Sequence, residues 1–389
     1  MDLLKVLIPL FFLAFSLGEI ARIQFPNSVT IGLFDISVVL LSFFILAKTR
    51  KNNFILKTPI LLFILASIFS LIINVARYEP SQILIGSLYL VRWIAYTGIY
   101  FSAASLTDKG ISYTLKFMML SGIFIVLFGY IQLLFYPSLR NLYYLGWDEH
   151  MHRMFSTFLD PNFAGVFFVL FFVFLYLFRD KLVSNKILSS LFLLLTLGAV
   201  ILTYSRGAYL MLLVCALIYS IVNRNWKIIT GTILLFIAIF LVLSPGFYIE
   251  NTNLLRMAST TQRLESSKQA LAIFKKNPLG VGFNTFRYAR EKYGFKDLSL
   301  YGPSHAGAGV DNSLILILTT TGILGFLIYL YLLYKMFRIG FLNFRKNKMG
   351  TVLIVSLGGL LVNSLFINSL LYSFAMAWIF LIAGLTENT

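Results

Sequence analysis

The segment PNFAGVFFVLFFVFLYLF at residues 161–178 decides the class of this protein. It carries no charge, and a helix needs about 20 such residues, at about 1.5 Å each, to cross the hydrocarbon core of a bilayer. Similar apolar runs recur along the 389-residue chain. Lipid cannot satisfy open backbone groups, and the runs lack the alternation of barrel strands, so they predict helices. The fold class is therefore an all-α polytopic membrane protein.

Twelve such runs are present, and they predict about twelve transmembrane helices in a single integral membrane domain, residues 1–389. The runs cover residues 3–18, 29–47, 55–75, 83–105, 111–135, 161–178, 187–203, 207–222, 228–245, 312–335, 351–367 and 370–386. The first run also resembles the apolar part of a signal peptide, but no small-residue cleavage site follows it, so we expect a helix. The last two runs are separated by a predicted polar turn that contains Asn363, Ser364, Asn368 and Ser369.

The composition excludes an ordinary soluble domain. Charged residues make up 12% of the chain and hydrophobic residues 59%, whereas soluble proteins carry about 25% charged residues. The one cysteine, Cys215, excludes a disulfide scaffold. A net charge of +17 would suggest a nucleic-acid partner for a soluble domain, but in a membrane chain the basic residues report topology. We therefore expect no nucleic-acid partner.

The basic residues predict the orientation of the chain in the membrane. With a cytoplasmic N-terminus, most Lys and Arg residues between the runs fall in cytoplasmic loops, as the positive-inside rule requires. These residues are Lys48, Arg50, Lys51, Lys109, Arg179, Lys181, Lys186, Arg224, Lys227, Lys335, Arg338, Arg345, Lys346 and Lys348. The short outer loops hold only Arg22, Arg77, Arg140, Arg153 and Arg206. Twelve crossings then place both termini in the cytoplasm and residues 246–311 outside.

The long outer loop at residues 246–311 is where function is expected, because long ordered loops are uncommon without a role. A helix is predicted from about Ser259 to Lys276, and Pro278 with Gly280 then ends it. Its apolar face contains Leu264, Leu271 and Phe274. Its basic face contains Arg263, Lys268 and Lys275. This pattern predicts an amphipathic helix that lies on the outer membrane surface.

Two shorter junctions on the same side contribute an arginine each. Tyr204-Ser205-Arg206-Gly207 connects the seventh and eighth runs, so Arg206 is expected at the depth of the lipid headgroups. A simple helix anchor at the interface would also explain Arg206. Arg153 lies in the preceding outer loop, where Asp160 is a natural N-cap for a helix that has Pro161 at its first position.

Arginines gathered on one side of a membrane suit a diphosphate ligand. The guanidinium group is always charged and binds phosphate oxygens in pairs, which lysine cannot do. The candidates are Arg206, Arg263, Arg287 and Arg290. Together they would bind the diphosphate of a glycan-carrying polyprenyl lipid and stabilise it as a leaving group. Glycan transfer also needs a base for the acceptor hydroxyl, and either His305 or Asp311 could serve.

A rival interpretation places a metal ion at a short acidic and histidine-containing segment. Its members, Asp148, Glu149, His150 and His152, carry hard or borderline metal ligands. They lack a recognised ligand spacing, so neither a metal nor a cofactor is predicted. A lone Gly280-Val-Gly282 is likewise not expected to bind a dinucleotide, because no strand precedes it and no third glycine follows at the required spacing.

Motifs between residues 153 and 325 resemble those of the superfamily of O-antigen ligases and O-antigen polymerases. In chain order they are Arg153-Met-Phe-Ser-Thr-Phe-Leu-Asp-Pro-Asn162, Thr203-Tyr-Ser-Arg206-Gly, Arg263 to Ala270 with Asn277-Pro-Leu-Gly-Val-Gly282, and Asp311-Asn312-Ser-Leu with Thr321-Gly322-Ile-Leu-Gly325. The first motif is similar to the family's segment that opens a central helix, and the second to its Ser-Arg-Gly junction. The third is similar to the family's outer-loop signature, and the fourth to its closing motif.

The resemblance implies a glycosyltransferase of the bacterial inner membrane with its active site on the outer face. Such an enzyme moves an oligosaccharide from undecaprenyl diphosphate to a glycan or lipid-core acceptor, without metal and with inversion. Other polysaccharide-assembly proteins are expected partners. The resemblance assigns binding of the diphosphate or glycan to Arg206 and Arg263. By their places in the motifs, Arg153 and Asn312 are expected substrate-binding residues as well.

Two positions depart from the family pattern. Ser267 stands where a tryptophan is usual, and Asp311 stands where the closing motif has histidine. The base therefore stays open between His305 and Asp311. The departures favour a polymerase of surface or exopolysaccharide over a lipid A ligase.

A transporter or flippase of lipid-linked glycans is the alternative function. Asp35 and Arg92 lie within apolar runs and would be its substrate or ion residues. A satisfied polar pair explains them better. The two halves of the chain also show none of the internal repetition that many transporters have.

Overall fold

The structure, a computed structural model, describes residues 4–24, 30–49, 53–145, 147–182, 185–243, 258–295 and 309–388. Its long helices are α1 (Leu4–Leu17), α2 (Leu33–Lys48), α3 (Lys57–Ile72), α4 (Pro80–Ala103), α5 (Asp108–Phe135), α6 (Pro161–Leu182), α7 (Lys186–Leu202), α8 (Arg206–Asn223), α9 (Trp226–Leu243), α12 (Ser313–Asn343), α13 (Lys348–Asn363) and α14 (Ser373–Asn388). Two more helices, α10 (Ala258–Lys276) and α11 (Phe286–Lys292), precede α12. The 3-10 turns are η1 (Gly18–Ile20), η3 (Val75–Arg77), η4 (Arg140–Leu145) and η5 (Ser156–Phe158).

The predicted all-α class holds for the described residues. The two strands found there, β1 (Arg22–Gln24) and β2 (Thr30–Gly32), form a small antiparallel hairpin. Each of the twelve predicted apolar runs overlaps one of the long helices. Within the described ranges, six helices are long and apolar enough to cross a membrane: Lys57–Arg77, Pro80–Ala103, Asp108–Phe135, Pro161–Lys181, Arg206–Asn223 and Ser313–Asn343. The chain is thus a multi-pass membrane protein, and the number of twelve crossings stays a prediction.

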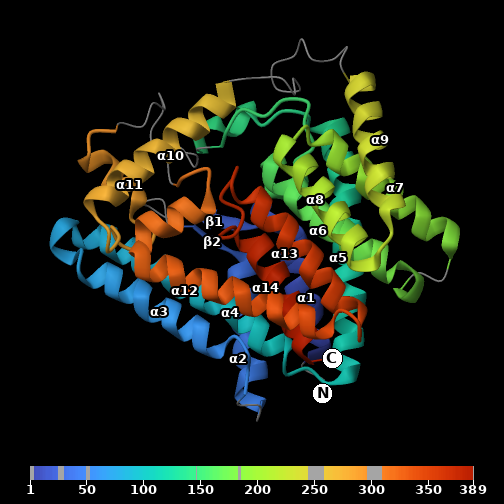
Figure 1. Ribbon diagram of the computed structural model, residues 1–389, viewed down its shortest axis with the longest axis horizontal. Helices are drawn as coiled ribbons and strands as arrows, with labels where there is room; N and C mark the ends of the chain where they lie inside the picture. The colour runs from blue at the N-terminus through green and yellow to red at the C-terminus, as the bar shows by residue number, and fades with distance from the viewer. Residues whose placement is uncertain are drawn as a thin grey trace.

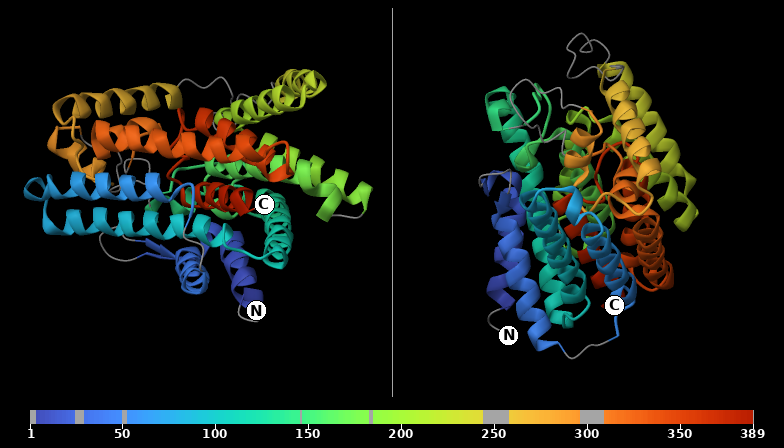
Figure 2. Two further views of the ribbon diagram at one scale, coloured as in Figure 1. Left: turned by 60° about the horizontal axis from the view of Figure 1, so that its bottom comes forward. Right: turned by 90° about the vertical axis from the view of Figure 1, so that its left-hand side faces the viewer.

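The long helices form one bundle with both chain termini at the same end (Figure 1). We call the opposite end the distal end. Helices α10 and α11 lie together beside the turn between α3 and α4 and the start of α12, as both further views confirm (Figure 2). A small hydrophobic cluster holds them there, with Ala270 and Ile273 of α10, Phe286 of α11 and Tyr78 of the turn buried together.

The helix α10 confirms the predicted helix of the long loop and begins at Ala258, so Ser259 lies inside it. The face that contacts α12 contains Ala270 and Ile273, both fully buried. The predicted apolar face is a different one, because Leu264 and Leu271 are exposed. This exposure leaves them available to lipid, and the placement of α10 on the membrane surface stays a prediction.

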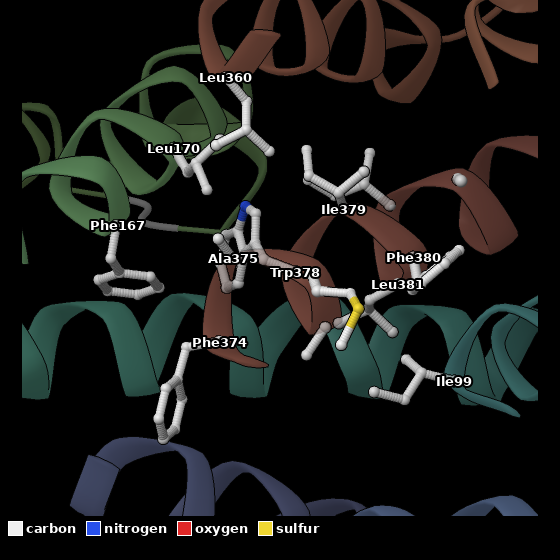
Figure 3. Close-up of a cluster of buried hydrophobic side chains, with 14 of the residues drawn as sticks. Ile99, Phe167, Leu170, Leu360, Phe374, Ala375, Trp378, Ile379, Phe380 and Leu381 are labelled. Carbon is white, nitrogen blue, oxygen red and sulfur yellow. The ribbon is translucent and has the colours of Figure 1, made fainter. Parts of the chain in front are cut away.

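The centre of the bundle is α14. Every residue from Phe374 to Thr386 is buried, and Trp378 packs between side chains of α6 and α13 such as Phe167 and Leu360 (Figure 3). Inside a membrane there is little hydrophobic drive between helices, so close packing has to come from small residues. Gly359 of α13 supplies such a contact, since a Cβ atom there would collide with Cys215 of α8.

An irregular segment joins α13 to α14. We call residues 364–372 the α13–α14 connection, and it confirms the polar turn predicted from Asn363 to Ser369. Ser364 and Ser369 in it are fully buried. Irregular backbone at this depth has to be hydrogen-bonded within the protein. The start of α12 supplies such partners: Ser313 N–H donates to the Ser364 carbonyl at 2.8 Å, and Ser313 Oγ accepts from Leu370 N–H at 3.1 Å.

Candidate functional site

The first turns of four helices meet at the α13–α14 connection. Gly207 of α8 lies against the amide of Asn363, because a Cβ atom on this glycine would sit 3.1 Å from Asn363 Nδ2. Phe163 of α6 stacks on Tyr372 with ring centroids 4.0 Å apart. The first turns of α12 and α14 adjoin the same segment. Helix N-termini carry partial positive charge, so this end of the bundle favours an anion.

Arg206 is the first residue of α8, and Arg263 of α10 lies near it. Ser205 caps α8 by accepting a hydrogen bond from Ala208 N–H, which places the Arg206 side chain at the helix start. The two guanidinium groups are close enough for their like charges to act on each other. An anion that entered between two such arginines would be stabilised by both. The structure places the charge of Arg263 near Arg206, and their predicted role in binding a diphosphate stays a prediction.

Arg153 is buried and hydrogen-bonded within the protein, and its predicted contact with substrate stays a prediction. It is 2% exposed, its Nε donates to the Thr203 carbonyl at 2.8 Å, and its Nη2 donates to Asn162 Oδ1 at 3.2 Å. Ser205 Oγ donates to the same Asn162 oxygen at 3.1 Å. These bonds fasten the start of α6 to the turn between α7 and α8, which carries Arg206.

Asp160 caps α6, as predicted. Its Oδ1 accepts hydrogen bonds from the backbone N–H groups of Asn162 at 2.6 Å and Phe163 at 3.3 Å. Its Oδ2 lies 3.8 Å from His150 Nε2. Burial opposes ionisation of the carboxyl group, but the nearby His150, the hydrogen bond from Asn162 N–H and the charge of Arg153 hold the pKa of Asp160 below its ordinary value.

Asp311 lies just before α12, near Arg263. Burial raises the pKa of the Asp311 carboxyl group above its ordinary value, and the charge of Arg263 opposes the shift. The carboxylates of Asp160 and Asp148 raise it further. A raised pKa makes this carboxylate a stronger base than an exposed aspartate. His305, the other predicted base, lies outside the described residues.

Asn312 serves as a helix cap. Its Oδ1 accepts from Ile315 N–H at 3.0 Å and its Nδ2 donates to the Leu365 carbonyl at 3.2 Å. Both ends of the amide are therefore engaged in tying α12 to the α13–α14 connection. This assigns Asn312 a structural task, whereas its predicted contact with substrate stays untested.

Arg287 and Arg290 lie on α11, which packs against α10 and α12. Phe286 and Ala289 of the same helix are buried in the small hydrophobic cluster around Tyr78. The charge of Arg287 acts on Tyr288, and the charge of Arg263 acts on Arg206 and Asp311. The predicted substrate contacts of Arg287 and Arg290 stay predictions.

A backbone clamp that the sequence analysis missed fixes α10 relative to α12. At Gly322 the helix α12 is kinked, with φ 70° and ψ −176°. The carbonyls of Thr319 and Thr320 accept hydrogen bonds at 3.0 Å from Val281 and Gly282 N–H. The clamp needs glycine on both sides, because a Cβ atom on Gly280 would sit 2.6 Å from Gly322 N. The two glycine motifs of the sequence were the available signal.

The comparison with known families agrees with this geometry. The sequence model of the O-antigen ligase family matches residues 191–330. This segment is similar to O-antigen ligases. It runs from α7 to the middle of α12 and therefore contains Arg206, Arg263, Asp311 and both sides of the clamp. A comparison with curated proteins found no match. The chain is accordingly a multi-pass membrane protein with a segment that is similar to O-antigen ligases.

The residues of the rival metal site do not come together in the part of the chain that the structure describes. His150 is turned inward toward Asp160, Glu149 pairs with Arg140 at 3.4 Å, and His152 is exposed. Among the residues that the structure describes, no group of three or more His, Cys, Asp or Glu side chains could hold a metal ion.

The polar pair within the helices is satisfied, as the sequence analysis favoured. Arg92 Nε donates to Asp35 Oδ1 at 2.7 Å and a second nitrogen binds Oδ2. Tyr96 OH donates to Asp35 at 2.8 Å, and Gly32 N–H donates at 2.8 Å. Asp35 is thus fully used in capping α2 and in fastening it to α4, which gives it a structural explanation.

Proposed function

We propose that this protein transfers or polymerises a glycan from undecaprenyl diphosphate onto an acceptor sugar at the distal end of its helix bundle. The observation that supports the proposal is that the charge of Arg263 acts both on Arg206, at the converging helix starts, and on Asp311. The positive-inside pattern of the sequence supports a distal end that faces away from the cytoplasm, in a bacterial inner membrane.

The arginines suit the leaving group of this reaction. When the bond between the sugar and the diphosphate breaks, its electron pair and negative charge stay on a diphosphate oxygen. Guanidinium groups and helix N-termini that already point toward that oxygen stabilise its charge, because they need no rearrangement during the reaction. In the proposed reaction Arg206 and Arg263 perform this task.

An apolar groove supports a polyprenyl tail on the donor. It has a volume of about 520 Å³ and is lined by Tyr209, Leu210, Leu213, Ile233, Phe236, Ile237 and Leu241, from α8 and α9. The first three follow Arg206 by three, four and seven residues, so they share its face of α8. A lipid whose diphosphate lies at Arg206 can therefore place its chain in the groove.

Filling this groove should weaken the use of long-chain donors. Leu213→Trp is expected to raise the KM for an undecaprenyl-linked donor about tenfold, because the indole occupies space that the chain needs. A donor with a prenyl chain too short to reach Leu213 should be affected much less. Leu217→Trp is the matched control, since Leu217 is exposed one turn further along α8 outside the groove. Equal KM values for the two variants would exclude the groove as the lipid site.

Asp311 is the proposed base among the described residues. Its carboxylate takes the proton of the acceptor hydroxyl while the hydroxyl oxygen forms the new bond to the anomeric carbon and the bond to diphosphate breaks. His305 stays the alternative base, since the sequence leaves both open. The position of Asp311 beside Arg263 supports its selection, because it places the base near the leaving group.

The pH dependence distinguishes the two bases. The pKa of Asp311 is raised above about 3.9, the ordinary pKa of aspartate. As the pH falls through this raised pKa, the carboxylate is protonated and can no longer act as the base. The rate should therefore fall on the acid side at a higher pH than an exposed aspartate would give. Asp311→Asn should remove at least about 99% of the rate. Initial rates of the purified protein across pH check this, and an active Asp311→Asn variant would transfer the role to His305.

Transfer by the purified protein tests the function itself. In detergent with a lipid-linked oligosaccharide, the protein should lengthen the glycan or move it to an added acceptor, whereas a flippase would leave both unchanged. The glycan profile of a deletion strain then separates the two reaction types. Single repeat units would indicate a polymerase, and an uncapped lipid core would indicate a ligase.

A further inference from the structure

Four polar atoms around the α13–α14 connection are buried with no hydrogen-bond partner among the described residues. They are Asn363 Oδ1, Asn368 Oδ1, Ser369 Oγ and Tyr372 OH. The side chains of Asn363 and Ser369 are 1% and 0% exposed. Polar groups inside a membrane protein are costly and are usually paired or functional. Four such atoms within ten residues of sequence indicate a ligand that carries several hydroxyl groups.

The position of these atoms relates them to the candidate site. Asn363 lies against Gly207, next to Arg206. Asn368 lies close to Gly309, two residues before Asp311, since a Cβ atom on this glycine would be 3.7 Å from Asn368 Nδ2. The connection therefore borders both the arginine that holds the leaving group and the carboxylate that serves as base.

Tyr372 is held in a fixed position beside the same site. Its ring stacks on Phe163 of α6 at 4.0 Å between centroids. The charges of Glu19 and Asp160 act on its hydroxyl group. A rigid ring with an unpartnered hydroxyl offers a hydrogen bond at little cost in conformational entropy.

We propose that the α13–α14 connection is a binding site for a sugar ring, in which Asn363, Asn368, Ser369 and Tyr372 form hydrogen bonds with the ring's hydroxyl groups. The proposal rests on the proposed glycan transfer and names the part of the site that recognises the sugar. Amide and hydroxyl groups can donate and accept, as the hydroxyls of a sugar do. The ring belongs either to the acceptor or to the first sugar of the donor glycan, and the two sources are separated by titrating each substrate.

Ser369→Ala and Tyr372→Phe in the purified full-length protein test the site, because each removes a single oxygen. Each variant is expected to raise the KM for the acceptor or for the glycan-bearing donor about fivefold to tenfold. Inhibition by polyprenyl diphosphate that carries no sugar should stay at the parental level. Ser356→Ala is the matched control, since Ser356 on α13 is also fully buried with an unpartnered hydroxyl and lies about two turns away from Asn363.

The outcomes are distinct. Removing a buried hydroxyl that has no partner costs no hydrogen bond, so the thermal unfolding temperature should be unchanged or raised in all three variants. Only Ser369→Ala and Tyr372→Phe should lose affinity for the sugar. Parental KM values for both substrates in Ser369→Ala and Tyr372→Phe would overturn the sugar site. A matching loss of affinity for the sugar-free diphosphate would overturn it too, because the connection would then belong to the diphosphate site. A parent protein that forms no product would instead refute the proposed function.

Discussion

Arg206→Lys should reduce product formation at least about 100-fold at an unchanged level of protein in the membrane. Lysine keeps the positive charge at the start of α8 but loses the planar fork that binds two phosphate oxygens at once. The loss should be severe, because in the proposed reaction Arg206 and the nearby charge of Arg263 bind one anion together. The measurement is the amount of transferred glycan per amount of purified protein, with the KM for the donor determined separately.

Arg224→Lys is the control for this substitution. Arg224 follows the opposite end of α8, where it is exposed and its backbone N–H closes the helix. The same chemical change there should leave transfer at the parental rate. Product of normal amount and length from Arg206→Lys would refute the role of Arg206 in binding the diphosphate.

Gly322→Ala is expected to abolish transfer and to lower the amount of folded protein. The backbone of Gly322 has φ 70° and ψ −176°, a region that only glycine occupies freely. A Cβ atom there would also sit 2.6 Å from the Leu279 carbonyl oxygen. The clamp would then open, and Arg263 on α10 would lose its fixed distance from Asp311. Size-exclusion chromatography of the detergent extract and the transfer assay measure the two effects.

Gly231→Ala provides the matched control for the clamp. Gly231 lies within α9, and a Cβ atom there meets nothing within 4 Å. Alanine in a helix interior is favoured over glycine by about 1 kcal/mol, so this variant should extract and function at least as well as the parent. If Gly322→Ala behaved in the same way, the clamp would not be needed to hold α10.

The sequence predicted the helices and the arginine pair because both leave local signals. Apolar runs of sufficient length mark a helix wherever it lies in the bundle. Arg206 stands in a junction of only a few residues, so its depth follows directly from the ends of the two flanking runs. Asp160 was likewise predicted as a cap from the proline that follows it, and its bonds to Asn162 and Phe163 confirm that.

The sequence did not predict which helix lies at the centre. Leucine and phenylalanine are equally suited to lipid and to the protein interior, so the run that forms α14 looked like any other. Its burial around Trp378 depends on the helices that surround it. The clamp escaped prediction for a similar reason. Gly280 and Gly322 lie far apart in the chain, and their contact is between backbones rather than between recognisable side chains.

The converging helix starts have a consequence for turnover. Glycan transfer converts a sugar-capped diphosphate into a terminal one, which exposes an additional ionisable oxygen. The spent carrier lipid is thus more negative than the donor, and the positive field around Arg206 and Arg263 attracts it more strongly. If the proposed reaction is right, we expect release of the spent lipid to be the slow step and the reaction that removes it from the membrane leaflet to limit synthesis.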